Sequence, residues 1–209
     1  MSEVSVRVRG VPRFRDLAVM AALCFALAGC ALLPGGGPAP LDTYELTAVA
    51  PGGGTSRHGR QILIAQPSAL KSLDSQNIVI TTAPGSIEYL KGAQWADRLP
   101  RIVQVRLAET FQRSGKLGGV GLPGEGLAID YQVLTEVRSF QVAVHGGTAA
   151  EVEIYVKLVD DRNGVVRASR DFTASQPVTA AGNDAYVAAL DQAFGAVADE
   201  IVRWTLARI

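Results

Sequence analysis

The clearest pattern in the chain is an alternation of apolar and polar residues over 149–160. This two-residue period is typical of a strand that turns one face to a core and the other to solvent. The apolar members are Val152, Ile154, Val156 and Leu158. Asn163-Gly164 follows and predicts a hairpin turn into a strand over 165–174, and another strand-like stretch covers 127–140. We therefore predict three strands in the second half of the chain.

The first half of the chain contains four shorter strand-like stretches. They cover residues 44–49, 61–65, 77–82 and 87–90. A polar, glycine-rich loop over 51–59 separates the first two, and Pro84-Gly85 turns the chain into the last.

Two segments have the 3.6-residue period of amphipathic helices. In the first, Asp97 is expected to cap the helix, Pro100 fits the first turn, and Ser114-Gly115 ends it. Its apolar face consists of Ile102, Val103, Leu107 and Phe111. The second helix is predicted over 184–207. Its apolar stripe consists of Tyr186, Leu190, Phe194, Val197, Ile201 and Trp204.

The order of strands, helix, strands and helix predicts the fold class. We expect an α+β domain over 41–209, with a mostly antiparallel sheet covered on one face by the two helices. No internal repeat is evident in the sequence.

The first 29 residues have the pattern of an export signal. Four arginines, at positions 7, 9, 13 and 15, precede an uncharged and mostly apolar run over 17–28. This run is shorter than the roughly 20 residues needed to span a bilayer. We interpret it as a cleaved signal peptide rather than as a membrane anchor.

Leu27-Ala28-Gly29-Cys30, at the end of the apolar run, resembles the lipobox of bacterial lipoproteins. The resemblance implies cleavage before Cys30, a diacylglyceryl thioether on its sulfur and an acyl group on its amino group. Several acyl chains hold a protein on a membrane where one chain holds it only weakly. An ordinary secretory signal, or a hydrophobic helix that contains a cysteine, is the alternative. The predicted organisation is a signal peptide over 1–29, a lipidated cysteine with a Pro/Gly tether over 30–40, and the domain over 41–209.

Composition limits the partners of the domain and the disulfides that could stabilise it. The whole chain has 20 basic and 20 acidic residues, and the body after Cys30 is also close to neutral. The composition therefore does not indicate the clustered basic face that nucleic-acid binding needs. Cys24 leaves with the signal, and acylation would consume the thiol of Cys30. The fold is therefore expected to depend on its hydrophobic core, without a disulfide.

The body offers few candidates for catalysis. His58 and His145 stand alone beside glycines in predicted loops, which is a poor basis for a metal site. No nucleophile-elbow or serine-lysine motif occurs. We predict no catalytic residue, no metal and no cofactor, although the sequence alone does not exclude a nucleophilic serine.

Three further patterns have structural explanations. Residues 119–124 match Gly-x-Gly-x-x-Gly, but a helix precedes them and a strand is expected to follow, so we interpret them as a mobile loop rather than a nucleotide site. The aspartates at 160–161 are expected in a hairpin rather than in a calcium loop. Tyr89 and Trp95 could line an apolar groove, but a hydrophobic staple at the start of the first helix is the favoured interpretation.

Taken together, the lipobox and several short motifs resemble the ABC-type transport auxiliary lipoprotein family, which includes the lipoprotein of the Pqi system. Their order and spacing extend over nearly all of 41–209. The motifs are Tyr44-Glu45-Leu46, Ile78-Val79-Ile80 followed by Tyr89, Trp95-Ala96-Asp97 with Pro100 before a helix that ends at Ser114-Gly115, and a strand from Tyr131 to Phe140 that contains Glu136.

The resemblance implies a non-enzymatic, periplasm-facing subunit that docks on an MCE-domain protein of an ABC-type system moving lipids between two membranes. Ala31 after the lipidated cysteine is the kind of residue associated with sorting to the outer membrane. Family members can form rings that match their partner, so a homo-oligomer is expected. Two alternatives stay open: a carrier that binds lipid between sheet and helices, and a lipidated periplasmic hydrolase.

Overall fold

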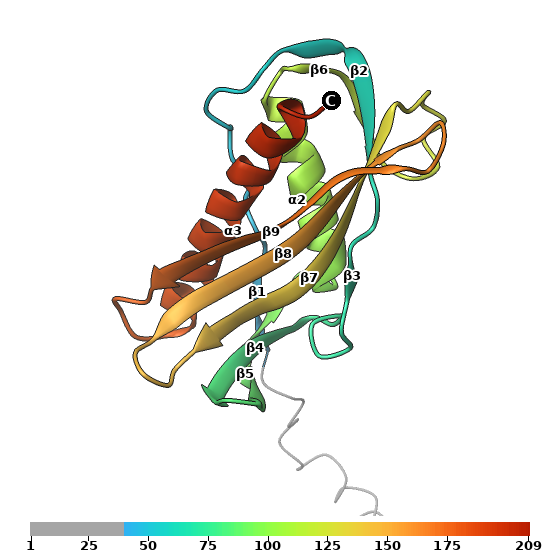
Figure 1. Ribbon diagram of the computed structural model, residues 1–209. Helices are drawn as coiled ribbons and strands as arrows, with labels where there is room; N and C mark the ends of the chain where they lie inside the picture. Colours follow the sequence, from blue (N-terminus) through green and yellow to red (C-terminus); the bar gives the residue numbers. More distant parts are fainter. Residues whose placement is uncertain (1–39) are drawn as a thin grey trace, which may run out of the picture. The chain divides into compact units, whose positions relative to one another are not determined.

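The three long strands of the second half form one side of the sheet in the computed structural model, which describes residues 40–209 (Figure 1). They are β7 (Tyr131–Ala143), β8 (Ala149–Asp160) and β9 (Val166–Pro177), and each is antiparallel to the next. The predicted turn at Asn163-Gly164 is confirmed, with Gly164 at a φ of 71°. The predicted alternation is confirmed as well, since the four apolar residues of β8 are buried.

The free edge of β7 is covered by three short strands in succession. They are β2 (Arg57–Ile64), β3 (Ser68–Ala69) and β4 (Asn77–Ala83), all parallel to β7. Each pairs with a different part of β7, so the chain follows this edge from one end to the other. β7 is thus the strand on which both halves of the sheet are assembled.

The remaining strands extend the sheet on the outside. β5 (Ser86–Trp95) is antiparallel to β4, β1 (Asp42–Tyr44) is parallel to β5, and β6 (Leu117–Gly121) is parallel to β2. The prediction of an α+β domain with a mostly antiparallel sheet and two helices is confirmed. The long pairings of β7 with β8 and of β8 with β9 are antiparallel, and so is the pairing of β4 with β5. The remaining pairings are short and parallel.

Both helices cover the same face of the sheet. α2 spans Leu99–Arg113 and α3 spans Asn183–Leu206. Every residue of their predicted apolar stripes is buried except Tyr186, which is partly buried. Neither of these helices, within residues 40–209, is long and apolar enough to cross a membrane.

Aromatic side chains fill the space between helices and sheet. Phe140 on β7 lies 5.8 Å from Trp95 and 6.3 Å from Phe194 of α3, measured between ring centroids. A second pair, Phe172 and Trp204, lies 5.5 Å apart in an edge-to-face arrangement. These spacings are within the range in which aromatic pairs attract one another. The core therefore holds sheet and helices together without a disulfide among the described residues.

A bulge at Arg138 keeps both halves of β7 turned toward this core. Val137 pairs with Ile154, but Ser139 pairs with Glu153, which leaves Arg138 as an extra residue. The core-facing residues are therefore odd-numbered before the bulge and even-numbered after it. They are Val133, Thr135 and Val137, followed by Phe140 and Val142, and Ala143 at the end of the strand is buried as well.

Several predicted boundaries at the start of the domain were wrong. The first strand ends at Tyr44 rather than at 49, because the carboxylate of Asp191 accepts a hydrogen bond from the backbone N–H of Thr47 at 2.7 Å in place of a strand partner. β2 begins at Arg57, within the predicted loop, and β5 extends to Trp95. β7 begins at Tyr131 rather than at 127.

The start of the first helix also differs from the prediction. Its N-cap is Arg98, and the carboxylate of Asp97 accepts a hydrogen bond from the backbone N–H of Arg98 at 2.6 Å instead of capping the first turn. Pro100 lies in the first turn, as predicted. Trp95 is a buried core residue at the end of β5 and Tyr89 is exposed, so the two form neither a staple nor a shared groove.

The aromatic core yields a stability prediction. Replacing Phe140 with Ala removes its ring from between Trp95 and Phe194, and such substitutions cost about 3–5 kcal/mol. We expect a loss of that size in the free energy of unfolding, measured by urea denaturation. The control is Leu70→Ala, at a side chain 73% exposed, where we expect a change within about 0.5 kcal/mol. Equal effects of the two substitutions would contradict this description of the core.

Candidate functional site

The predicted lipid-attachment site lies outside the described residues. Cys30 and the lipobox residues Leu27, Ala28 and Gly29 precede Pro40, where the description of the chain begins. The assignment of Cys30 therefore stays a prediction from the sequence. The structure instead defines the surfaces that such an anchor would hold at a membrane.

The two histidines of the domain are not brought together. His58 lies on β2, not in the predicted loop, and His145 lies in the turn after β7. Within residues 40–209, no group of three or more His, Cys, Asp or Glu side chains is placed to hold a metal ion.

The predicted mobile loop over 119–124 is in part a strand. β6 includes Gly119 and Gly121 and runs beside β2. A Cβ atom on Gly118 would lie 2.3 Å from the carbonyl oxygen of His58, so glycine permits the close approach of the two strands. These glycines serve strand packing and do not form a phosphate loop.

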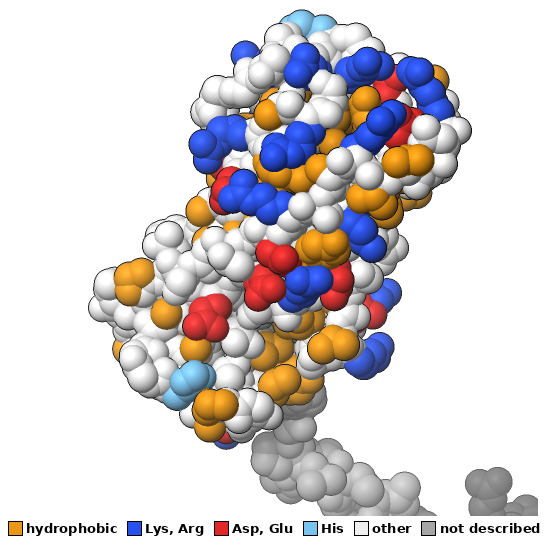
Figure 2. Space-filling model, in the orientation of Figure 1, with side chains coloured by type: hydrophobic (Ala, Val, Ile, Leu, Met, Phe, Trp, Pro, Cys, Tyr) orange, Lys and Arg blue, Asp and Glu red, His pale blue; other side chains and the backbone are white. Residues whose placement is uncertain are grey.

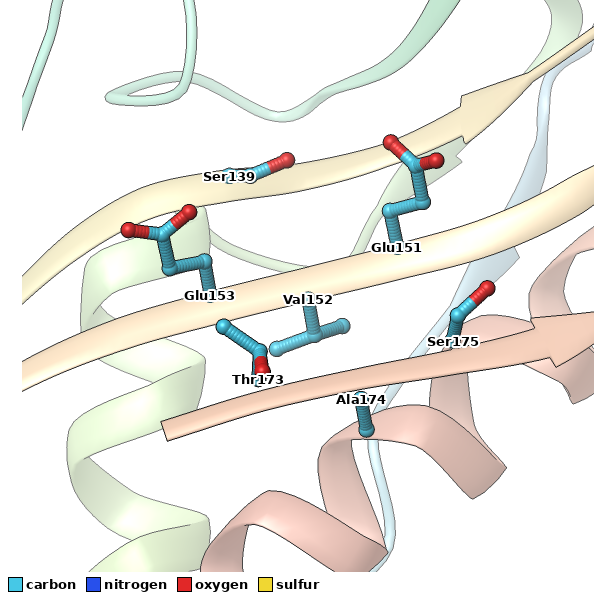
Figure 3. A pocket seen from close by; sticks show the side chains of 7 residues that line it. All are labelled: Ser139, Glu151, Val152, Glu153, Thr173, Ala174 and Ser175. Atoms are coloured by element: carbon cyan, nitrogen blue, oxygen red, sulfur yellow. The ribbon is translucent and has the colours of Figure 1, made fainter. Parts of the chain in front are cut away.

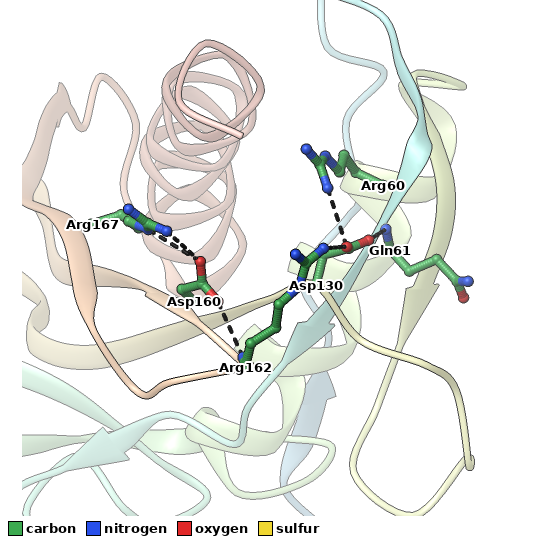
Figure 4. Close-up of polar contacts among 6 residues, drawn as sticks. All are labelled: Arg60, Gln61, Asp130, Asp160, Arg162 and Arg167. Atoms are coloured by element: carbon green, nitrogen blue, oxygen red, sulfur yellow. Dashed lines mark hydrogen bonds and ion pairs between the residues drawn. The ribbon is translucent and has the colours of Figure 1, made fainter.

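An arginine-aspartate cluster joins three parts of the chain at one end of the sheet (Figure 4). Asp130, just before β7, accepts hydrogen bonds from Arg60 at 3.2 Å and from Arg162 at 3.3 Å on the same oxygen, Oδ1. Its Oδ2 accepts a hydrogen bond from the backbone N–H of Gln61 at 3.0 Å. Asp130 thereby ties β2 to the turn between β8 and β9.

The second aspartate of this cluster, Asp160, ends β8. It accepts hydrogen bonds from the guanidinium of Arg167 at 2.5 Å and from the backbone N–H of Arg162 at 3.1 Å. The side chains of the cluster, with Tyr131, line an almost entirely polar hollow of about 190 Å³. With three arginines and two aspartates, the cluster carries a net positive charge.

Both aspartates are held in their ionised form. The hydrogen bond from the backbone N–H of Gln61, together with Arg162 and Arg60, lowers the pKa of Asp130. Arg167 and the backbone N–H of Arg162 lower the pKa of Asp160. A carboxyl whose pKa is lowered by folding stabilises the fold above its unfolded pKa, and the effect is lost as the pH falls through the folded pKa.

Further cations extend this cluster into a basic end of the molecule. Arg57 donates to the carbonyl oxygen of Leu206 at 3.1 Å, and Arg208 donates to that of Trp204 at 3.1 Å, near the C-terminus of α3. Figure 2 shows Lys and Arg side chains gathered over this part of the molecule, at the top of the view. We call these residues the basic end: Arg57, Arg60, Lys116, Arg162, Arg167 and Arg208.

The face of β7, β8 and β9 opposite the helices is open and carries hydroxyl and carboxylate groups. Ser139, Glu151, Glu153, Thr173 and Ser175 line a shallow hollow of about 300 Å³ on it (Figure 3). Beside the hollow, the guanidinium of Arg138 lies 4.2 Å from the ring centroid of Tyr155 and pairs with Asp171. This face offers hydrogen-bonding and charged groups to a partner, with two acidic side chains at its centre.

A lipid cavity between sheet and helices, as the carrier alternative requires, is not formed by the described residues. That space is occupied by Trp95, Phe111, Phe140 and Phe194, each at most 1% exposed. A lipid could enter it only by displacing these rings.

The sequence contained little sign of the arginine-aspartate cluster. Arg60 and Asp130 are 70 residues apart, and only the parallel pairing of β2 with β7 brings them together. The aspartates at 160–161 were predicted to lie in a hairpin rather than in a calcium loop, and the hairpin is confirmed. The adjacent charges of opposite sign at 160–162 were the one local signal of ion pairing.

The family follows from comparison with known proteins. A model of the family described as the ABC-type transport auxiliary lipoprotein component matches residues 44–202. The chain belongs to this family. The match covers almost the whole described domain, with all of α2 and most of α3.

Individual relatives are consistent with this assignment. An uncharacterised protein of Bradyrhizobium diazoefficiens, bll6063, is 32% identical over 194 residues, which are 86% of this chain and 49% of that protein. The chain thus spans about half the length of this relative. The crystal structure of XCC0632 from Xanthomonas campestris matches with a TM-score of 0.72 and 30% identity, over 79% of this chain and 95% of that chain.

A further crystal structure, of an uncharacterised protein, shares the fold. It matches with a TM-score of 0.65 and 18% identity, over 79% of this chain and 99% of that chain.

The role of Asp130 is testable through the pH dependence of stability. We expect Asp130→Asn to lower the free energy of unfolding by about 1–3 kcal/mol at pH 7, because hydrogen bonds to a charged group are lost. The difference from the wild type should begin to close as the pH falls below about 4, the ordinary pKa of an unfolded Asp, and should disappear as the pH falls through the lower pKa of the folded Asp130 carboxyl. Denaturant titrations at several pH values measure both quantities.

The matched control is Asp161→Asn. Asp161 follows Asp160 in the chain, is exposed, and its side chain accepts one hydrogen bond, from Gln132. We expect a change within about 0.5 kcal/mol at either pH. A loss for Asp130→Asn that persists unchanged at pH 3 would contradict the ionised cluster.

Proposed function

We propose that the chain is a lipid-anchored, periplasm-facing docking subunit of an ABC-type system that moves lipids between membranes. In this proposal Cys30 holds the protein in the outer membrane, and the folded domain binds an MCE-domain protein of the system. The subunit itself is non-catalytic and acts by position and by contact. The observation that carries the proposal is the family match over 44–202, combined with the lipobox that ends at Cys30.

The geometry of the domain supports a docking role. Its aromatic core fixes sheet and helices as one body, while the open sheet face and the basic end present charged groups to a partner. Charged groups on an interface mainly provide specificity and speed of association. We further propose that several copies of the subunit assemble around the partner.

The lipidated cysteine yields the first test of this proposal. Cys30→Ala removes the only thiol in the lipobox, so we expect loss of radiolabelled palmitate incorporation, accumulation of the precursor and loss of outer-membrane fractionation. Cys24→Ala is a matched control within the same signal segment and should be processed and labelled like the wild type. Unchanged lipid labelling of the Cys30→Ala protein would overturn the anchor.

A second test separates docking from the carrier and hydrolase alternatives. We expect cross-linking in intact cells to join the chain to an MCE-domain protein, and native mass spectrometry of the isolated subunit to show no bound phospholipid, because aromatic rings fill the core. Co-purified phospholipid without such a cross-link would favour the carrier. Labelling of the domain by an active-serine probe would favour the hydrolase.

A further inference from the structure

At the end of the domain opposite the arginine-aspartate cluster lies a surface with few charges, bordered by the exposed carboxylates Asp42 and Asp184. Three segments meet there: the β4–β5 turn with the first part of β5 (83–92), the β7–β8 turn (144–149) and the end of β9 with the following loop (177–182). Backbone hydrogen bonds join them, from Val144 N–H to Thr81 and from Val178 N–H to Thr148. Their only Asp, Glu, Lys or Arg residues are Glu88 and Lys91, which have opposite signs. We call these three segments the neutral end.

The neutral end exposes apolar side chains. Ile87 is 51% exposed and Tyr89 is 46% exposed, both on β5. Ala83 and Pro84 in the adjacent turn are exposed as well. Figure 2 shows few charged side chains in the lower part of the view, where β4 and β5 lie in Figure 1.

The strand register directs the start of the domain toward this end. β1 is parallel to β5, with Asp42 opposite Ala93. The chain before Asp42 therefore enters from the side on which β5 itself begins, next to the β4–β5 turn. Leu41, the residue before β1, is also exposed, at 49%.

The length of chain before the domain keeps this end close to its anchor. Cys30 and Pro40 are ten positions apart, with nine residues between them. Even a fully extended chain of that length reaches only about 35 Å. A bilayer that holds Cys30 therefore lies within reach of the neutral end, while the basic end lies at the far end of the sheet.

From these observations we infer that the neutral end contacts the bilayer in which Cys30 is anchored, with Ile87 and Tyr89 entering the interfacial layer. This inference rests on the proposed lipid attachment. Tyrosine favours the membrane interface because its ring is apolar and its hydroxyl is polar. A surface without net charge approaches lipid headgroups without burying an unpaired ion. The contact turns the basic end away from the anchoring membrane, toward the space where a partner would be met.

The experiment uses the full chain, processed and lipidated in cells and then reconstituted into vesicles. The vesicles contain phosphatidylethanolamine and phosphatidylcholine, with a fraction of spin-labelled phosphatidylcholine as quencher. An environment-sensitive fluorophore is attached through Ala83→Cys at the neutral end or through Val166→Cys on β9, near the basic end. Because acylation occupies the thiol of Cys30, each introduced cysteine is the only free thiol of the mature chain.

We expect the fluorophore at position 83 to be quenched by the spin-labelled lipid and shifted to shorter wavelength, and the fluorophore at 166 to be unaffected. Adding Ile87→Ser and Tyr89→Ser should abolish the quenching at 83. The matched pair Val165→Ser and Val166→Ser removes exposed apolar residues far from the neutral end and should leave the quenching at 83 intact.

The possible failures are distinguishable. A protein that does not float with the vesicles lacks its lipid anchor, which overturns the proposed attachment at Cys30. A protein that floats but is unquenched at 83, or is quenched at 166 instead, overturns the neutral-end contact and leaves the anchor standing. Repeating the assay with phosphatidylglycerol in the vesicles tests the opposite orientation, because the basic end would then be the attracted surface.

Discussion

The register of β7 is the constraint on which the rest of the structure depends. This strand pairs with β8 along one edge and with β2, β3 and β4 in turn along the other. In a strand, a shift by one residue turns every side chain to the opposite face. The bulge at Arg138 makes such a shift once, at the position where the apolar sequence itself changes from odd to even. The core side of β7 therefore stays buried on both sides of the bulge, and Thr135 is its one polar member there.

The same bulge shapes the open face. The side chain of Arg138 extends over the ring of Tyr155 and pairs with Asp171 on β9. The extra residue in β7 thus keeps the core-facing side chains on one face of the strand, and its own guanidinium contacts Tyr155 and Asp171 on the open face. At the start of β7, Asp130 and Asp160 bind arginines from β2, the β8–β9 turn and β9, and the ion pairs of Asp130 join segments that are distant in sequence.

Residue periodicity predicted most of the fold, since the alternation in β8 and the apolar stripe of α3 depend only on near neighbours along the chain. The missed elements depend on distant partners. β6 contains three glycines and lacks an apolar alternation, and it becomes a strand because β2 lies close beside it. Similarly, Asp191 on α3 ends the first strand early by binding Thr47. The cluster around Asp130 could not be predicted for the same reason, because its members meet only after the parallel pairing has formed.

Family membership and the arrangement of surfaces support the proposal that this protein acts by position and by contact. One end carries few charges and adjoins the start of the domain, and the other is rich in arginine. The most direct measurement of this account is binding of the purified, lipidated protein to the purified MCE-domain protein of the same system, followed by surface plasmon resonance. The account predicts saturable binding that weakens as salt is raised, because charged surfaces make the contact. Absence of binding at low salt, with both proteins folded, would contradict it.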